Sequence, residues 1–310
     1  MNTALLSHVA CLGHDPGPGH PESPERLTAV RAALEGESFM YLDRRDAPLA
    51  TVEQLARVHP RRHVEQVLAA VPAGDGWFAI DGDTVLSSGS REAALRAAGA
   101  VIAGVDLVMT GEVRNAFCAV RPPGHHAEAA RAMGFCLFNN VAAGAAHARA
   151  VHGARRVAVI DFDVHHGNGI EDIFWDQPDL FYASVHQAPL FPGTGEAFET
   201  GVAGNILNLP LAAGSGSAEF RAAVAERILP AIEAFGPDLV MISAGFDAHR
   251  RDPLADLRLG VEDFAWVTRQ IADLAGRVCD GRIVSSLEGG YDLHALASCA
   301  AAHVRELMVG

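Results

Sequence analysis

Short apolar runs rich in β-branched residues alternate along this chain with longer segments of helical periodicity. That alternation is typical of a parallel sheet whose strands are joined by crossover helices. The last four runs are continuously hydrophobic, as expected when helices cover both faces of the sheet. We predict strands over Ala4–Leu6, Phe39–Tyr41, Asn115–Val120, Arg156–Phe162, Leu180–His186, Asn205–Leu209, Leu239–Ala244 and Ile283–Leu287. We predict helices over Pro24–Leu34, Arg61–Ala70, Ser90–Thr110, Val141–Val151, Ala218–Phe235, Val261–Val278 and Leu293–Met308.

We expect one large α/β domain over residues 1–310. The chain has 310 residues, of which 49% are hydrophobic and 20% are charged, so it can bury a sizeable core and is not expected to be disordered. Proline and glycine are densest in three segments, which we predict to be surface loops: Gly13–Pro24, Val71–Gly82 and Pro189–Gly204.

The charge and the cysteines narrow the function classes. A formal net charge of −14 repels phosphate backbones, so we expect no nucleic-acid partner, whereas a basic peptide or a polyamine would suit the chain. The five cysteines are odd in number and form no CxxC pair, which indicates a reducing compartment. Because neither a signal peptide nor an apolar run of ~18–20 residues is present, we expect a soluble, cytoplasmic protein with no membrane partner. The sequence leaves open whether the protein forms a homo-oligomer.

Polar clusters directly follow four of the predicted strands. They are Arg121–His126, Asp161–Asn168, Gly245–His249 and Glu288–Asp292. In an open α/β sheet, ligands bind outside the carboxyl ends of the strands. Four polar clusters at these ends therefore predict a functional site along one edge of the sheet.

The second cluster carries the strongest chemical signal. Asp161, Asp163 and His165 are spaced two residues apart, which points all three to one face of an extended chain. A buried carboxylate is costly unless it meets a cation, a metal ion or several donors. The competing interpretation is a helix cap formed by Asp163 or Asn168, although capping needs one polar residue and not four.

A metal ion is the simplest partner for these groups. Two carboxylates and one imidazole are a plausible set for a catalytic zinc ion that keeps an open coordination position. Asp163 and His165 supply two ligands. Asp247 is the best candidate for the third, because it follows another strand at the same edge, with an ordinary turn residue as the alternative.

Two further features favour catalysis at this edge. His125 and His126 follow a rigid Pro-Pro-Gly turn, and histidine is the usual proton carrier near neutral pH; a lone histidine would more often be structural. Tyr291 follows two glycines that allow the backbone to approach a ligand closely. Its phenol could stabilise a developing oxyanion, or it could simply pack over the strand end.

Taken together, these motifs resemble the histone deacetylase superfamily. The matching stretches are Gly19–Arg26, Arg121-Pro-Pro-Gly-His-His126, Asp161-Phe-Asp-Val-His-His-Gly167, Phe191-Pro-Gly-Thr-Gly195, Ser243-Ala-Gly-Phe-Asp247 and Glu288-Gly-Gly-Tyr291. They occur in family order and span most of the chain. The form Gly245-Phe-Asp-Ala-His, followed by Asp252-Pro253-Leu254, is similar to the class II branch and its bacterial amidohydrolases.

The resemblance implies an arginase-like, three-layer α/β fold with a central, mainly parallel, eight-stranded sheet flanked by helices. It implies one catalytic zinc ion on Asp163, His165 and Asp247. It also implies a structural potassium ion held by Asp161, Asp163, His165, Ser184 and Val185. A second ion would lie near Phe174, Gln177 and Leu180.

Catalytic and channel residues follow from the same resemblance. His126 would be the general base and later the acid, with His125 as its electrostatic partner. Asp161 would orient His125, and Asn168 would face His126, where class I members carry an aspartate. Six residues would contact the acylated substrate: Gly134, Phe135, Phe191, Leu254, Gly289 and Gly290.

The implied activity is zinc-dependent hydrolysis of the amide bond of an N-acyl (acetyl) lysine, in a peptide or protein, or of a small lysine-like acylated amine. Some class II members carry histidine at the position of Tyr291 and hydrolyse acetyl-lysine poorly, so the tyrosine predicts deacetylase competence. An acetylpolyamine amidohydrolase is the first alternative. Polyamine-preferring relatives generally add an acidic gate or a long loop, whereas this chain has Leu254 at the gate position and a short segment over Val71–Asp83.

Two more distant functions stay open. A binuclear manganese hydrolase of the arginase type would need a second metal-binding aspartate where Ala248 and His249 stand. A non-catalytic binder of acylated ligands would be expected to lack one of the site groups, and none is missing from this sequence.

Overall fold

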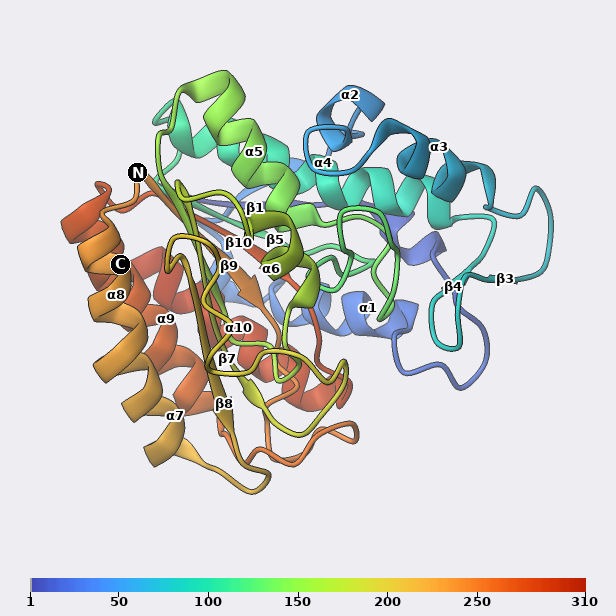
Figure 1. Ribbon diagram of the computed structural model, residues 1–310. Coiled ribbons are helices and arrows are strands. Elements are labelled where there is room, and N and C mark those ends of the chain that lie inside the picture. Colours follow the sequence, from blue (N-terminus) through green and yellow to red (C-terminus); the bar gives the residue numbers. More distant parts are fainter. Residues whose placement is uncertain (1) are drawn as a thin grey trace.

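Eight strands form one sheet at the centre of the protein, and every neighbouring pair is parallel (Figure 1). The computed structural model describes residues 2–310. The strands are β1 (Thr3–Ser7), β2 (Asp43–Asp46), β5 (Asn115–Cys118), β6 (Val157–Asp161), β7 (Leu180–Gln187), β8 (Ile206–Leu211), β9 (Leu239–Ala244) and β10 (Ile283–Leu287). Their order in the sheet is β2-β1-β5-β10-β9-β6-β7-β8. The predicted eight-stranded α/β fold is confirmed.

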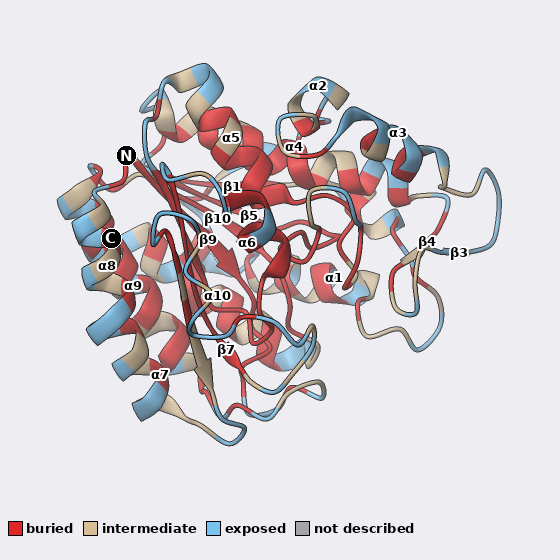
Figure 2. Ribbon diagram, viewed as in Figure 1, coloured by how far each residue is buried: buried red, intermediate tan, exposed pale blue. Residues whose placement is uncertain are grey.

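Helices cover both faces of this sheet. One face packs against α4 (Ser90–Met109) and α5 (Asn140–His152), and the other is covered by α1 (Pro24–Ala33), α9 (Val261–Val278) and α10 (Leu293–Val309). The central strands are consequently buried along their whole length, as Figure 2 shows. This burial explains why their sequences are continuously hydrophobic and not alternating.

The remaining elements are shorter. The predicted helix over residues 218–235 is formed by α7 (Ser217–Ala223), a π-helical turn (Val224–Ile228) and α8 (Leu229–Phe235). The others are α2 (Val52–Leu55), α3 (Arg61–Ala69), α6 (Asn168–Phe174) and two 3-10 turns at Val9–Gly13 and Glu37–Phe39. Within residues 2–310, no helix has both the length and the apolar character that crossing a membrane requires.

The strand predicted over Phe39–Tyr41 is wrong. Phe39 ends a 3-10 turn and is buried, while Met40 and Tyr41 are exposed, at 64% and 74%. The second strand is instead β2, which pairs with β1 at the edge of the sheet. Its sequence is Asp-Arg-Arg-Asp and it is largely exposed, so backbone hydrogen bonds alone define it and no hydrophobic pattern marks it.

The segment Val71–Gly82 is also more ordered than predicted. It contains β3 (Phe78–Ala79), which pairs with β4 (Val85–Leu86) in a small antiparallel hairpin. The strands are two residues long and β3 is exposed, which is too short for a period to be visible in the sequence. The hairpin brings Asp83 toward the carboxyl edge of the main sheet, where the predicted site lies.

The order of the strands assembles the site. The four polar clusters follow β5, β6, β9 and β10, and these strands are the four consecutive central ones, in the order β5-β10-β9-β6. Because all four are parallel, their carboxyl ends lie along the same edge. The predicted convergence of the polar clusters on one edge is confirmed.

Candidate active site

Asp163, His165 and Asp247 meet at the ends of β6 and β9. One ligand atom from each lies within 4.8 Å of the others, and all three residues are buried. The Nδ1 atom of His165 lies 3.1 Å from Asp163 Oδ1 and 3.3 Å from Asp247 Oδ2. The structure therefore brings together the three groups predicted as metal ligands.

Backbone N–H groups fix the two carboxylates. Gly289 donates to Asp163 Oδ2 and Val164 to Asp247 Oδ1, each at 2.8 Å. Asp247 Oδ2 is buried and, although it lies 3.3 Å from His165 Nδ1, it forms no hydrogen bond with any described residue. A methyl group at Gly245 would overlap Asp163, and one at Gly289 would overlap Asp247, so glycine is required where the backbone passes these carboxylates.

The electrostatics of the cluster call for a cation. Burial raises the pKa of the Asp247 carboxyl, and the neighbouring Asp163 raises it further. Burial also acts to raise the pKa of Asp163, but the imidazoles of His125 and His165 outweigh it and lower that pKa. Two buried carboxylates this close need a positive charge between them.

The donor set fits zinc. Two carboxylates and one imidazole are borderline-hard ligands, and three protein ligands leave a position for substrate or water. The orphaned Asp247 Oδ2 atom is the observation that a bound metal would account for. His249 and Asp252 do not add to this set: His249 Nδ1 accepts from Arg251 N at 3.2 Å, and both Asp252 oxygens accept backbone N–H groups.

A second cluster of possible ligands lies on α4 and α5. Asp106 accepts hydrogen bonds from Nε2 of His147 at 2.7 Å and from Nε2 of His152 at 2.6 Å. Arg57 donates to Nδ1 of His147 at 2.7 Å. The proton of His147 is therefore on Nε2, where it satisfies Asp106, and no metal is needed to explain the arrangement.

Each histidine of the predicted pair has its own partner. Nδ1 of His125 lies 3.0 Å from Asp161 Oδ2, and Nδ1 of His126 lies 2.8 Å from Asn168 Oδ1. The Asn168 amide donates to Glu128 Oε1 at 2.8 Å, which turns its oxygen toward His126. Both imidazoles consequently carry a proton on Nδ1, and the Nε2 atom of His126 is left as an acceptor.

The two imidazoles have oppositely shifted pKa values although their centres are only 4.0 Å apart. Burial acts to lower the pKa of His125, but the carboxylates of Asp163 and Asp161 raise it to about 10. Burial lowers the pKa of His126 well below its usual range, and the neighbouring His125 and His165 lower it further. The protein thus shifts the pKa of the two rings in opposite directions, as expected for an electrostatic partner beside a base.

Asn168 does not cap the following helix. It is the first residue of α6, whose N-cap is Gly167, and no side-chain cap is formed there. Asp163 lies before that position and is held by Gly289 N and His165 N. The capping interpretation of Asp163 and Asn168 is therefore wrong.

A cavity of about 210 Å³ opens onto these groups. It is lined by Asp83, His126, Gly134, Phe135, His165, Leu190, Phe191, Leu254 and Tyr291. Six of the nine were predicted as catalytic or substrate-contacting residues. The Phe191 ring lies 5.0 Å from that of His126, nearly perpendicular to it, and Phe135 lies 5.9 Å from Tyr291. Two aromatic walls thus lead to the histidine and the tyrosine.

Close backbone packing shapes this cavity. Gly134 has φ +56° and passes so near His126 that a methyl group would lie 2.7 Å from its ring. Phe135, the next residue, has φ +67°, a conformation that costs a phenylalanine about 1–3 kcal/mol. Thr84 helps to hold it, since its hydroxyl accepts from Phe135 N at 3.2 Å.

Several supporting residues were not predicted. Glu288 Oε2 accepts from Gly124 N at 2.7 Å and His125 N at 3.1 Å, and burial raises the Glu288 pKa to about 7. Arg26, buried behind Tyr291, and Asp83 at the cavity were also missed. Glu288 and Arg26 lie in stretches that carry the family resemblance, but no sequence pattern shows that their charged side chains are buried.

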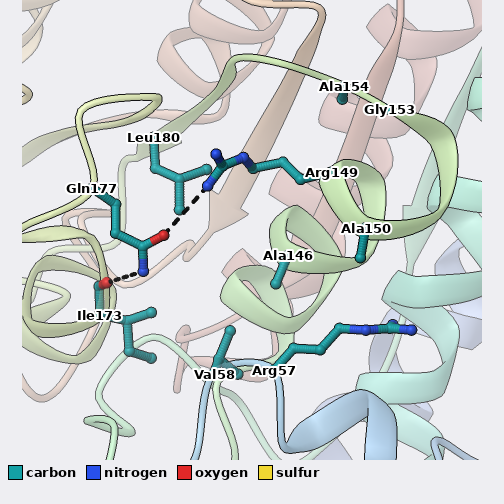
Figure 3. A pocket seen from close by; sticks show the side chains of 10 residues that line it. All are labelled: Arg57, Val58, Ala146, Arg149, Ala150, Gly153, Ala154, Ile173, Gln177 and Leu180. Atoms are coloured by element: carbon teal, nitrogen blue, oxygen red, sulfur yellow. Dashed lines mark hydrogen bonds between the residues drawn. The ribbon is translucent and has the colours of Figure 1, made fainter.

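A second cavity, larger than the one at the strand ends, lies elsewhere. It has a volume of about 440 Å³ and is lined by Arg57, Val58, Ala146, Arg149, Ala150, Gly153, Ala154, Ile173, Gln177 and Leu180 (Figure 3). Leu180 begins β7, so this cavity is at the amino edge of the sheet, opposite the strand-end clusters. None of its lining residues was predicted to be catalytic.

Comparison with known proteins shows the family to which this chain is similar. Residues 20–307 match the histone deacetylase domain. The chain is 40% identical to "Histone deacetylase 14, chloroplastic" of Arabidopsis thaliana over 98% of its own length and 76% of that protein. It is 38% identical to the "Histone deacetylase-like amidohydrolase" of Pseudomonas aeruginosa over 98% and 86%.

A solved structure is similar over almost the whole chain. The crystal structure of the HDA15 HD domain superposes with a TM-score of 0.94 at 36% sequence identity. The match covers 99% of this chain and 88% of that one. The likeness therefore includes the complete sheet and every strand end that contributes to the site.

Proposed function

The chain belongs to the histone deacetylase family, and on that premise we propose that it is a zinc-dependent deacetylase of acylated lysine side chains or lysine-like amines. The reaction consumes water and releases a carboxylate and a free amine. The observation that carries the proposal is that His126, Tyr291 and His165 of the Asp163–His165–Asp247 cluster line one aromatic-walled cavity.

Asp163, His165 and Asp247 would hold the zinc ion. When bound, such an ion polarises a carbonyl group and lowers the pKa of a water molecule. The potassium site predicted at Asp161, Ser184 and Val185 stays a prediction; Asp161 and Ser184 are register partners on β6 and β7.

His126 is the proposed proton carrier. Its Nδ1–H is donated to Asn168, so the Nε2 lone pair can accept a proton from the attacking water. His126 then returns that proton to the amine nitrogen as the amide bond breaks. His125, which is anchored to Asp161, lowers the pKa of His126.

Tyr291 is the proposed donor to the oxygen that becomes negative in the transition state. Burial raises the pKa of its hydroxyl well above the usual range, so the group stays protonated and can donate. A donor already placed where charge develops is worth about 10²–10³ in rate.

The channel suggests the shape of the substrate. Gly134, Phe135 and Phe191 form a narrow, largely apolar passage suited to an aliphatic lysine chain, and we propose that the Gly134 carbonyl accepts the substrate N–H. Asp83, also at the cavity, is complementary to a substrate N–H or a cation. Because this carboxylate could bind a cationic amine, an acetylpolyamine is the second candidate substrate. Leu254, at the predicted gate position, favours acyl-lysine instead.

The decisive experiment measures turnover of the zinc-loaded enzyme on acylated lysine peptides and on acetylspermidine, with a hydroxamate inhibitor as the control for the metal site. Metal analysis of the same sample distinguishes one zinc ion from two manganese ions per chain. We expect zinc-dependent hydrolysis with higher kcat/KM on an acetyl-lysine peptide. Faster turnover of acetylspermidine would favour the polyamine alternative, and no turnover of any acylated amine would favour a binding protein.

A further inference from the structure

The side chain of Asn205, just before β8, points into a ring of main-chain carbonyl groups. Its Nδ2 atom donates to the carbonyl oxygens of Phe174 at 2.9 Å, Gln177 at 3.2 Å and Leu180 at 2.9 Å. Its Oδ1 atom faces the N–H of Ala203 at 3.4 Å. Because the three carbonyl oxygens are all hydrogen-bond acceptors, only the nitrogen end of the Asn205 amide can point toward them.

The three carbonyls belong to the turn that joins α6 to β7. Hydrogen bonds within the turn orient two of them, since Gln177 N donates to Phe174 O at 3.0 Å and Leu180 N to Gln177 O at 2.9 Å. The Gln177 side chain points to the large cavity, where it contacts Arg149 and the Ile173 carbonyl (Figure 3). The oxygens therefore converge on one point, which the amide nitrogen occupies.

The loop before β8 leaves room for this amide. Gly201 has φ +68°, and a methyl group there would lie 2.6 Å from Asn205 Oδ1. The next residue, Val202, donates its N–H to the Trp175 carbonyl at 3.0 Å, which ties the loop to the same turn. Asn205 itself is 3% exposed, so its carboxamide lies in the protein interior.

Converging main-chain carbonyls are ligands for a monovalent cation, because they replace its water shell. The family resemblance predicted a second such ion near Phe174, Gln177 and Leu180. The structure does not fit that expectation, since an ion bound by these oxygens would coincide with Asn205 Nδ2. We propose that the Asn205 amide replaces the second cation in this chain and makes the turn independent of potassium.

The proposal is independent of the deacetylase activity and concerns only the α6–β7 turn. The amide group is neutral and has two N–H groups. It therefore forms hydrogen bonds with the carbonyl oxygens without adding a charge and without a bound ion that could dissociate. Asn205→Ala removes the amide and opens the space, whereas Asn205→Asp keeps its size but places an acceptor against three acceptors. Both variants are therefore expected to need a cation that the natural chain does not need.

Thallium(I), an electron-dense analogue of potassium, locates such ions directly. In crystals soaked with a thallium(I) salt, the natural chain should show no anomalous peak among the Phe174, Gln177 and Leu180 carbonyls. Asn205→Ala crystals should show one. A peak at this place in the natural chain would overturn the proposal, whether or not the variants fold.

Thermal unfolding gives a second readout. In choline chloride, Asn205→Asp and Asn205→Ala should unfold about 2–5 °C below the natural chain. In potassium chloride of equal ionic strength, that gap should narrow by at least half. Gln177→Ala removes only the glutamine side chain and keeps the Asn205 amide and the main-chain carbonyl of residue 177. This variant should respond to potassium like the natural chain. The same gap in both salts, with no thallium peak in Asn205→Ala, would show that these carbonyls do not bind a cation and would overturn the proposal.

Discussion

The guanidinium carbon of Arg26 lies 4.9 Å from the centre of the Tyr291 ring. The same guanidinium group donates to the carbonyls of Gly290 at 2.6 Å and Glu288 at 2.5 Å. Arg26 therefore holds the backbone that carries Tyr291 as well as the face of its ring. It is buried completely, and Glu22 compensates its charge.

Arg26→Lys should lower kcat on an acetyl-lysine peptide by about 10–100-fold, because lysine cannot reproduce the forked contacts and Tyr291 shifts. KM should change little, since the channel walls are untouched. In a Tyr291→Phe background, Arg26→Lys should lower kcat much less, because both substitutions act through the Tyr291 hydroxyl. Arg31→Lys, on the same helix, is the control. Equal losses in both backgrounds would contradict a positioning role.

Tyr291→Phe should lower kcat by about 10²–10³ and leave the thermal unfolding temperature almost unchanged. The substitution removes one hydroxyl group and keeps the ring packed against Arg26 and Phe135. Steady-state kinetics on an acetyl-lysine peptide check the effect. Tyr41→Phe, at a residue that is 74% exposed, should have no effect. Full activity of Tyr291→Phe would show that the tyrosine only packs over the strand end.

Gly289→Ala should abolish activity and weaken zinc binding strongly. A methyl group at this position would overlap the carboxylate of Asp247 and lie 2.6 Å from Asp163 Oδ2, so the ligands must move apart. Competition with a chromogenic chelator measures the zinc affinity. Gly276→Ala is a matched control: nothing lies within 4 Å of the added methyl, and alanine at this exposed position should stabilise helix α9 by about 0.5–1 kcal/mol. Unchanged zinc affinity in Gly289→Ala would refute the crowding argument.

The centre of the site could be predicted from local patterns. Asp163 and His165 share a face because side chains alternate along an extended chain, and Asp247 joins them because parallel strands end at one edge. The edge strand β2 could not be predicted, since backbone pairing defines it and its side chains are charged. The buried contacts of Arg26, Glu22 and Glu288 were also out of reach. They depend on the tertiary packing of charged side chains, whose burial no local sequence pattern reveals.

Glu22 makes the folded state sensitive to acid. Burial acts to raise its pKa, but Arg121, His14 and Arg26 lower it from 4.5 to about 2. Because the folded state favours the ionised form of Glu22, this carboxylate stabilises the folded state fully above about pH 4.5. That stabilisation is lost as the pH falls toward 2. The amount is about 3 kcal/mol, at roughly 1.4 kcal/mol for each pKa unit.

Urea unfolding between pH 6 and pH 3 measures this contribution. Glu22→Gln should lower the free energy of unfolding at pH 6 and reduce its fall toward pH 3. Glu37→Gln, at an exposed position, should follow the natural chain at every pH. If the natural chain and Glu22→Gln lost stability in parallel across this range, the ion pairs of Glu22 would not contribute to the acid sensitivity.

Leu254 offers a test of substrate choice. It lines the cavity together with Asp83, and its N–H is fixed by Asp252 Oδ1 at 2.9 Å, so a new side chain there should keep its direction. Leu254→Glu adds a second carboxylate near Asp83 and should favour a polycationic substrate. We expect the ratio of kcat/KM for acetylspermidine to that for an acetyl-lysine peptide to rise about 5–10-fold at low salt, and the gain to shrink as the salt concentration increases. Leu254→Gln has the same shape without the charge and should leave the ratio almost unchanged. If both variants raised the ratio equally, the shape of the cavity, and not its charge, would select the amine.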